Sequence, residues 1–163
     1  MMKKLASVFI LSVLIIGCKN KPIENPNIVK NAFEIFDASV PDDVIKYKNY
    51  NLDDTCPNLL DPRISKDEIN EVNNAWIDLN KNLGNYLIKQ DFTWGMKIKV
   101  WHKFYFDKDG KLNKYFFNLL EDNIEKEKRE QYKTLVKEFA ANYKLPLTKD
   151  SPFAQCGKGA FYN

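Results

Sequence analysis

The stretch that decides the fold is MKIKVWHKFYFDKDGKLNKYFFNLL, residues 96–120. Over 96–106, apolar side chains alternate with charged or amphipathic ones, a period of two that predicts a β-strand with one buried face. The turn DKDG follows, with Asp109-Gly110 at its centre, and 111–120 returns as a second, aromatic-rich strand. Together these segments predict a β-hairpin.

One helix is predicted before the hairpin and another after it. The first is expected over 65–89, where apolar residues recur at steps of three and four, and where Ser65 and Glu68 have the spacing of a capping box. The second is expected over 125–143, and it stops before Pro146.

The remaining segments complete the fold prediction. Apolar residues of 28–38 recur at helical spacing, which predicts a short helix. Residues 42–63 are expected to be turns and loop, with a short strand around Val44 to Tyr47. The last segment, SPFAQCGKGAFYN at 151–163, is expected to add a closing strand. The predicted class is therefore α+β, a small antiparallel sheet packed against two amphipathic helices.

The first eighteen residues, MMKKLASVFILSVLIIGC, have the three parts of a secretory signal. Lys3 and Lys4 form the charged region, 5–16 form the apolar region, and Gly17 stands just before Cys18. A helix that spans a membrane needs about 20 apolar residues, and this run is roughly half that long. The segment is therefore expected to be cleaved.

This arrangement resembles the lipobox of bacterial lipoproteins, in which a signal peptidase cuts before a cysteine that has been diacylated. The resemblance implies that 1–17 are removed and that Cys18 carries the lipid. The polar residues 18–27 then suit a lipidated tether, and 28–163 a single globular domain. The protein is expected to be exported to the bacterial cell envelope and held on a membrane by the lipid. The outer membrane is favoured because Lys19, rather than aspartate, follows Cys18.

Composition argues against nucleic acid as a partner. Without residues 1–17, the chain keeps 146 of its 163 residues, the length of one domain, and its formal net charge falls from +3 to +1. The apparent basicity comes mostly from the signal segment, and no block of lysine and arginine remains.

Three cysteines minus the lipidated Cys18 leave Cys56 and Cys156. In an oxidising compartment such a pair tends to form a disulfide, which stabilises by about 4 to 5 kcal/mol for a loop of this length. The alternative is that one of them is a nucleophile paired with His102, the one histidine of the sequence. His102 lies on the apolar face of its strand, which favours a packed side chain over a ligand or base.

No catalytic residue, cofactor or metal site is predicted. Asp107 and Asp109 imitate the start of a calcium loop, but Lys111 occupies the third ligand position and Leu112 the place of the required glycine. GKG at 157–159 lacks the rest of any phosphate-binding pattern.

The order hairpin, helix and final strand over 96–163 resembles the carboxy-terminal domain of TonB and related bacterial envelope proteins. The features that match are FYFDKDGKLNKYFF with its turn residue Gly110, the helix that ends near YKLPL, and the aromatic strand at AFYN. In that family the domain binds short segments of outer-membrane partners at a sheet edge. The present chain differs from it in its lipid anchor, its two cysteines and its lack of a long proline-rich spacer.

The sequence therefore predicts a non-enzymatic envelope module that binds a protein or peptidoglycan partner, most naturally at an exposed strand edge. Two alternatives stay open. The first, a small-ligand carrier, is motivated by aromatic residues: Trp94, Trp101, Tyr105, Tyr115 and Phe117. The second is a hydrolase that uses carboxylates such as Asp91, Glu121 or Asp122.

Overall fold

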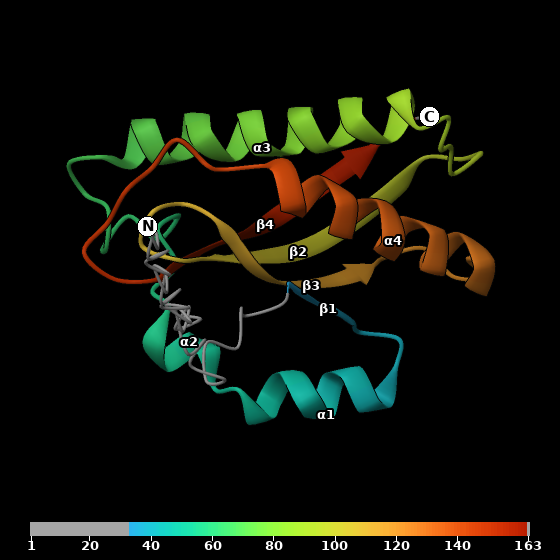
Figure 1. The fold of residues 1–163 in the computed structure, drawn as a ribbon, viewed down its shortest axis with the longest axis horizontal. Helices are drawn as coiled ribbons and strands as arrows, with labels where there is room; N and C mark the ends of the chain where they lie inside the picture. Colours follow the sequence, from blue (N-terminus) through green and yellow to red (C-terminus); the bar gives the residue numbers. More distant parts are fainter. Residues whose placement is uncertain (1–32, 163) are drawn as a thin grey trace, which may run out of the picture. The chain divides into compact units, whose positions relative to one another are not determined.

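The computed structural model describes residues 33–162, which form four strands and four helices (Figure 1). In chain order they are β1 (Glu34–Asp37), α1 (Pro41–Asn49), α2 (Leu52–Thr55), α3 (Ile69–Lys89), β2 (Ile98–Phe106), β3 (Leu112–Leu119), α4 (Lys126–Asn142) and β4 (Phe153–Phe161). The α+β class is confirmed. The predicted signal segment, the lipidated Cys18 and the tether lie outside the described residues.

The strands form one mixed sheet in the order β1-β3-β2-β4. β2 pairs antiparallel with both β3 and β4, whereas β1 pairs parallel with β3. The prediction of an antiparallel sheet is therefore wrong at β1. The chain leaves β1, forms three helices and β2, and only then enters β3, and such a long crossover connection is what allows parallel pairing.

β1 also corrects the helix predicted over 28–38, because residues 34–37 are extended. Ile35 packs against the main core, while Phe36 points to the opposite face and contacts the rings of Tyr47 in α1 and of Tyr50 just after it. Adjacent residues that both need apolar neighbours, on opposite sides, suit a strand better than one face of a helix.

α1 replaces the strand predicted around Val44. Pro41 starts the helix, Asp42 and Asp43 lie in its first turn, and Lys46 and Lys48 lie in its last. Pro at the first position and this order of charges both favour a helix, because they complement its dipole. None of the side chains of α1 is fully buried, so the apolar pattern that normally reveals a helix is absent.

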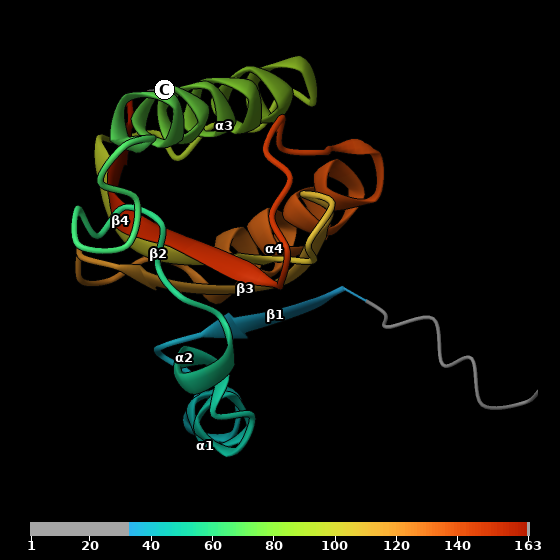
Figure 2. The same cartoon turned by 90° about the vertical axis from the view of Figure 1, so that its left-hand side faces the viewer.

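Helices α3 and α4 cover one face of the sheet, and α1 and α2 lie against the other (Figure 2). The main core lies between the first pair and the sheet, and its largest fully buried members include Tyr115, Tyr132, Phe104, Phe117, Leu79, Leu83 and Leu87. The stripes predicted at 65–89 and 125–143 supply the helical half of this core.

The hairpin is confirmed. β2 and β3 pair in register from Val100 opposite Leu119, with an irregularity at Tyr105 and Phe106, and Gly110 adopts a φ of +85° in the turn. The closing strand is confirmed as well, as β4, although it pairs with β2 and so lies at the edge of the sheet.

The start of α3 differs from the prediction. The helix begins at Ile69, and no side chain caps it. Ser65 and Glu68 form a turn before the helix, in which the backbone N–H of Glu68 donates to the carbonyl oxygen of Ser65. The Glu68 carboxylate pairs instead with Lys149 from the distant loop before β4, so the capping box does not form.

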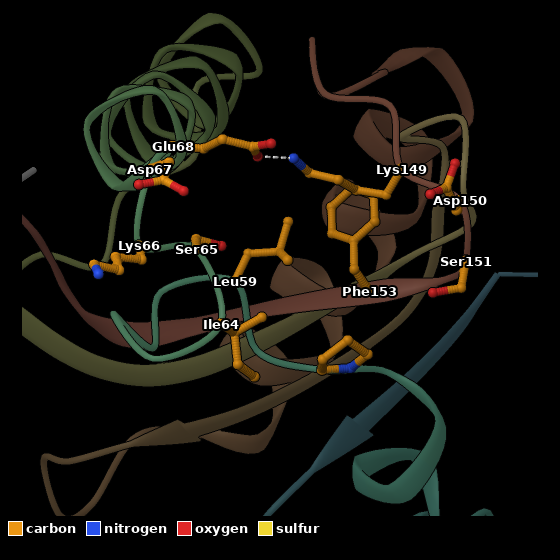
Figure 3. A pocket seen from close by; sticks show the side chains of 11 residues that line it. Leu59, Ile64, Ser65, Lys66, Asp67, Glu68, Lys149, Asp150, Ser151 and Phe153 are labelled. Carbon is orange, nitrogen blue, oxygen red and sulfur yellow. Dashed lines mark hydrogen bonds and ion pairs between the residues drawn. The ribbon is translucent and has the colours of Figure 1, made fainter.

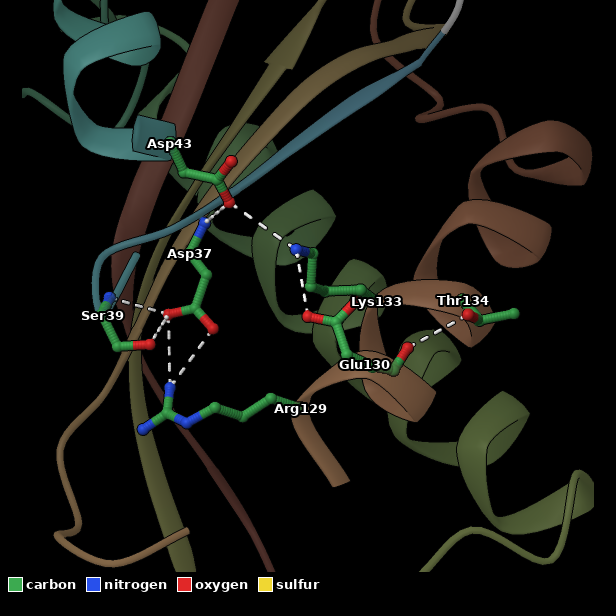
Figure 4. Close-up of polar contacts among 7 residues, drawn as sticks. All are labelled: Asp37, Ser39, Asp43, Arg129, Glu130, Lys133 and Thr134. Carbon is green, nitrogen blue, oxygen red and sulfur yellow. Dashed lines mark hydrogen bonds and ion pairs between the residues drawn. The ribbon is translucent and has the colours of Figure 1, made fainter. Parts of the chain in front are cut away.

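A buried ion pair ties β1 to α4 (Figure 4). Asp37 is 1% exposed, and its carboxylate accepts hydrogen bonds from the backbone and hydroxyl of Ser39 and from Nη1 of Arg129 at 3.2 Å. A second pair on the same helix, between Lys133 and Asp43 at 3.6 Å, lies closer to solvent.

Cys56 and Cys156 are free thiols here, so the predicted disulfide is absent from the structure. Cys56 is buried against Tyr105 and Ala154, and Cys156 stands opposite Lys103. Their pairing stays a prediction.

Candidate functional site

The first half of the free side of β4 is covered by a loop. In Ala154, both backbone groups point away from β2: its N–H donates to the carbonyl of Pro57 and its carbonyl accepts from the N–H of Leu59, each at 2.9 Å. Two residues further along β4, the N–H of Cys156 donates to the side chain of Asn58 at 3.2 Å. The loop therefore acts as a short neighbouring strand and then departs.

The second half of this side carries no neighbour. Alternation along an antiparallel strand turns the backbone groups of Lys158 and Ala160 outward, as it does those of Ala154. Among residues 33–162, neither forms a backbone hydrogen bond outside the β2 ladder. The open stretch, 158–161, is about 13 Å long. An unpaired edge of this kind is a template for an added strand.

A groove runs beside this open edge, between α3 and β4, which lie next to each other in both views (Figures 1 and 2). Its volume is about 330 Å³, and it is lined by Asn80, Lys81, Gly84, Asn85, Ile88, Ala160, Phe161 and Tyr162. Ile88 is 57% exposed and Tyr162 is 74% exposed. Ile77, seven residues before Gly84 and thus on the same side of α3, is 59% exposed.

Two glycines of β4 let α3 approach the edge closely. A Cβ atom on Gly157 would lie 2.9 Å from Cζ2 of Trp76, and one on Gly159 would lie 3.1 Å from Nε2 of His102 and 3.2 Å from Oδ1 of Asn80. The GKG segment thus has a packing role, which agrees with its lack of a phosphate-binding pattern.

Three lysines near the open edge have no carboxylate partner within residues 33–162. Lys81 lines it, Lys158 projects from β4, and Lys97 lies 4.6 Å from the centre of the Tyr162 ring. None of them forms an ion pair within residues 33–162. The site is therefore a short open sheet edge beside an apolar and positively charged groove.

His102 lies on the core side of β2, directly under α3. It is completely buried; Nδ1 is 3.2 Å from the hydroxyl of Tyr115, which is 2.7 Å from the hydroxyl of Tyr132, and Nε2 has no hydrogen-bond partner. Burial lowers the pKa of His102 to about 3. The imidazole is therefore neutral at pH 7 and out of reach of a substrate, as the prediction of a packed histidine states.

We expect His102 to make the protein less stable as the pH falls. Its pKa is depressed in the folded chain and about 6.5 in the unfolded chain, so acid favours the unfolded state. The stability that the neutral ring contributes is complete above pH 6.5 and is lost as the pH falls toward 3. The expected decrease between pH 7 and pH 5 is about 2 kcal/mol, measured by urea unfolding.

The control is His102→Phe, which removes this titration and should flatten the profile between pH 7 and pH 5. The carboxylates Glu34 and Asp61 have pKa values lowered to about 2, so their contributions are lost only in more acidic solution. An unchanged slope in the variant would contradict the burial of His102.

Cys56 and Cys156 are not placed to act as nucleophiles with His102. Cys156 stands opposite Lys103, the residue after His102, and successive side chains of a strand point to opposite faces. Cys56 packs against Tyr105, which shares the face of Lys103. Burial also raises the pKa of the Cys156 thiol, so the reactive thiolate is disfavoured.

A polar cluster fixes α2 on this outer face, and sequence reasoning did not find it. Lys103 is 7% exposed, and its ammonium lies 2.6 Å from the carboxylate of Asp53. The Tyr105 hydroxyl donates to the same oxygen at 2.7 Å and lies 2.5 Å from the hydroxyl of Tyr47. Burial raises the pKa of Tyr105. These polar groups form hydrogen bonds and an ion pair with one another, so the cluster holds α2 against the sheet and does not form an open binding site.

A second cavity, of about 340 Å³, lies between the start of α3 and the loop before β4 (Figure 3). The ion pair of Glu68 and Lys149 crosses it, and Ser65, Asp67 and Asp150 are also in its lining. The charged side chains that line this cavity are of both signs, so they favour no single class of ligand.

The other residues considered in the sequence lie apart from the groove lining. Asp91 is exposed just after α3; Glu121 accepts the backbone N–H of Lys99 at 2.7 Å, and Asp122 is exposed beside it. Of the aromatic residues proposed for a carrier, Trp101 is half-buried and the other four are buried. In residues 33–162, no group of three histidine, cysteine or acidic side chains is placed to hold a metal.

No protein-family model, curated protein or solved structure matches this chain. None of the helices within the described residues is both long and apolar enough to cross a membrane.

Proposed function

We propose that this chain is a membrane-anchored envelope lipoprotein that binds a partner protein by adding a strand of the partner to β4. The observation that carries the proposal is the pair of outward backbone groups on each of Lys158 and Ala160, which lack a partner within residues 33–162. The lipid predicted on Cys18 would hold the module on the membrane. In this function the protein binds without catalysing a reaction.

The groove supports a protein partner over a peptidoglycan partner. An added strand gains affinity from main-chain hydrogen bonds and specificity from pockets for alternate side chains. The edge of β4 offers the main-chain hydrogen bonds. The exposed side of α3, with Gly84 and Ile88, offers the pockets for side chains. A glycan strand has no backbone that matches the spacing of a β-ladder.

We expect Ala160→Pro to lower partner binding at least tenfold. Proline removes the outward N–H of residue 160, and it leaves the ladder with β2 intact because that N–H points away from β2. Ala160 is exposed, so the free energy of unfolding should change by less than about 1 kcal/mol. The measurement is cross-linking of the lipidated protein in its native membrane, with the captured partner quantified by mass spectrometry.

Ala160→Thr is the matched control, because it adds a side chain at the same place and keeps the N–H. It should capture the partner as the parent does. Equal capture by the proline variant would show that binding does not use the β4 edge. Cross-linked adducts with glycan alone would show that the partner is peptidoglycan and not a protein.

A further inference from the structure

We infer that the strand added to β4 is an acidic segment, with carboxylates on one face and apolar side chains on the other. This inference rests on the proposed function and names the chemistry of its partner. It follows from which side chains an added strand would meet on each face of the sheet at 158–161.

The alternation of β4 separates the two faces. Lys158 and Ala160 point to the outer face, while Gly159 and Phe161 point toward α3. Residues opposite each other on neighbouring strands share a face, so every second side chain of an added strand would point to the outer face, and the one opposite Lys158 would lie beside it. The side chains between them would point to the groove below α3.

Charge selects the residues on the outer face. Lys158 has no ion-pair partner within residues 33–162, and the groove lining contains Lys81 but no aspartate or glutamate. A glutamate opposite Lys158 would form a cross-strand pair of opposite charge, whereas a lysine there would be repelled. Lys97, at the end of the same edge, adds to the positive potential.

The exposed apolar residues of α3 favour apolar side chains on the other face of the added strand. Ile77 and Ile88 are 59% and 57% exposed, and Gly84 between them leaves space in the groove. Apolar side chains placed in the groove would remove Ile88, which lines it, from water, and each Å² of apolar surface buried contributes about 25 cal/mol. Valine or isoleucine, which also favour strands, fits this position.

The same charges argue against a second copy of this chain as the occupant. Pairing of two β4 edges would bring Lys81 and Lys158 of both copies together with no carboxylate in the groove lining. Lysine on an edge strand is a common device against such self-association.

The test uses the full chain, purified in detergent, and blocked eight-residue peptides that alternate Glu with Val, Lys with Val, or Glu with Ser. Binding is followed by the backbone amide NMR signals of 158–161 and by titration. We expect the Glu-Val peptide to shift these signals and to bind about tenfold or more tightly than either of the others. Lys158→Glu should reverse the preference, so that the Lys-Val peptide becomes the tighter ligand.

The remaining outcomes separate the two proposals. Equal binding of the Glu-Val and Lys-Val peptides at these amides would overturn the acidic partner and leave strand addition standing. Failure of every peptide to shift them would overturn strand addition at this edge. Shifts caused instead by phosphatidylglycerol vesicles, or by dimerisation of the protein alone, would overturn the inference in favour of a lipid surface or a second copy.

Discussion

Gly110→Ala is expected to lower the free energy of unfolding by about 3 kcal/mol or more. Gly110 has a φ of +85°, which costs a residue with a side chain roughly 1 to 3 kcal/mol. A Cβ atom there would also lie 2.7 Å from the carbonyl oxygen of Leu147 and closer still to that of Leu145. Both are backbone atoms, so the hairpin turn must move away from the segment before β4, whose Leu145 N–H bonds to the Gly110 carbonyl.

Gly95→Ala is the matched control for this prediction. Gly95 has a similar φ of +73°, but no atom lies within 4 Å of its added Cβ. Its cost should therefore be the backbone term alone, about 1 kcal/mol. Chemical denaturation of both variants measures the difference, and equal losses would show that the contact with 145–147 does not constrain the turn.

Arg129→Met is expected to destabilise the protein by about 3 kcal/mol or more, because it leaves the buried carboxylate of Asp37 without its cation. Removal of one partner of a buried pair costs about 3 to 5 kcal/mol, and the two hydrogen bonds from Ser39 remain. The pair connects α4 to β1, the one parallel strand, so we expect β1 to be the first element to lose protection in hydrogen exchange.

Lys133→Met provides the control on the same helix. Lys133 pairs with Asp43 and Glu130, whose side chains are 24% and 55% exposed against 1% for Asp37, so its loss should cost at most about 1 kcal/mol. Similar destabilisation by both variants would mean that burial of Asp37 does not raise the cost of losing its partner.

The open edge owes its position and length to contacts between distant segments. Asn58 and its neighbours cover β4 as far as Cys156, and the chain then turns away toward α3. Glycines at 157 and 159 allow Trp76 and His102 to lie against the strand, which brings α3 beside the edge. The open edge and the groove therefore depend on contacts between segments that lie as far apart in the sequence as 58 and 161.

Long periodic segments were predictable from the sequence. The alternation through β2 and the stripe that buries Leu79, Leu83 and Leu87 each repeat several times, so a single exception does not hide the pattern. The turn at Gly110 was predictable from its Asp-Gly pair. Helix α4 and the closing strand follow in the same way.

Short and unburied elements were not predictable. β1 has four residues, too few to show a period, and α1 has no fully buried side chain that would mark an apolar stripe. Ser65 and Glu68 have the spacing of a capping box, but Lys149, 81 residues away from Glu68, takes its carboxylate. Local rules fail there because a distant charge competes for the same group.

The sequence by itself determined the hairpin, the two long helices and the α+β class, because these depend on periods of two and 3.6 residues that each segment carries within itself. The prediction of a lipid on Cys18 likewise rests on a linear motif. Only the tertiary structure decided that β1 joins in parallel, that β4 is an edge, and that Lys158 and Ala160 face outward beside Ile88. Strand order and free backbone groups depend on which distant segments pair, and no local pattern records that choice.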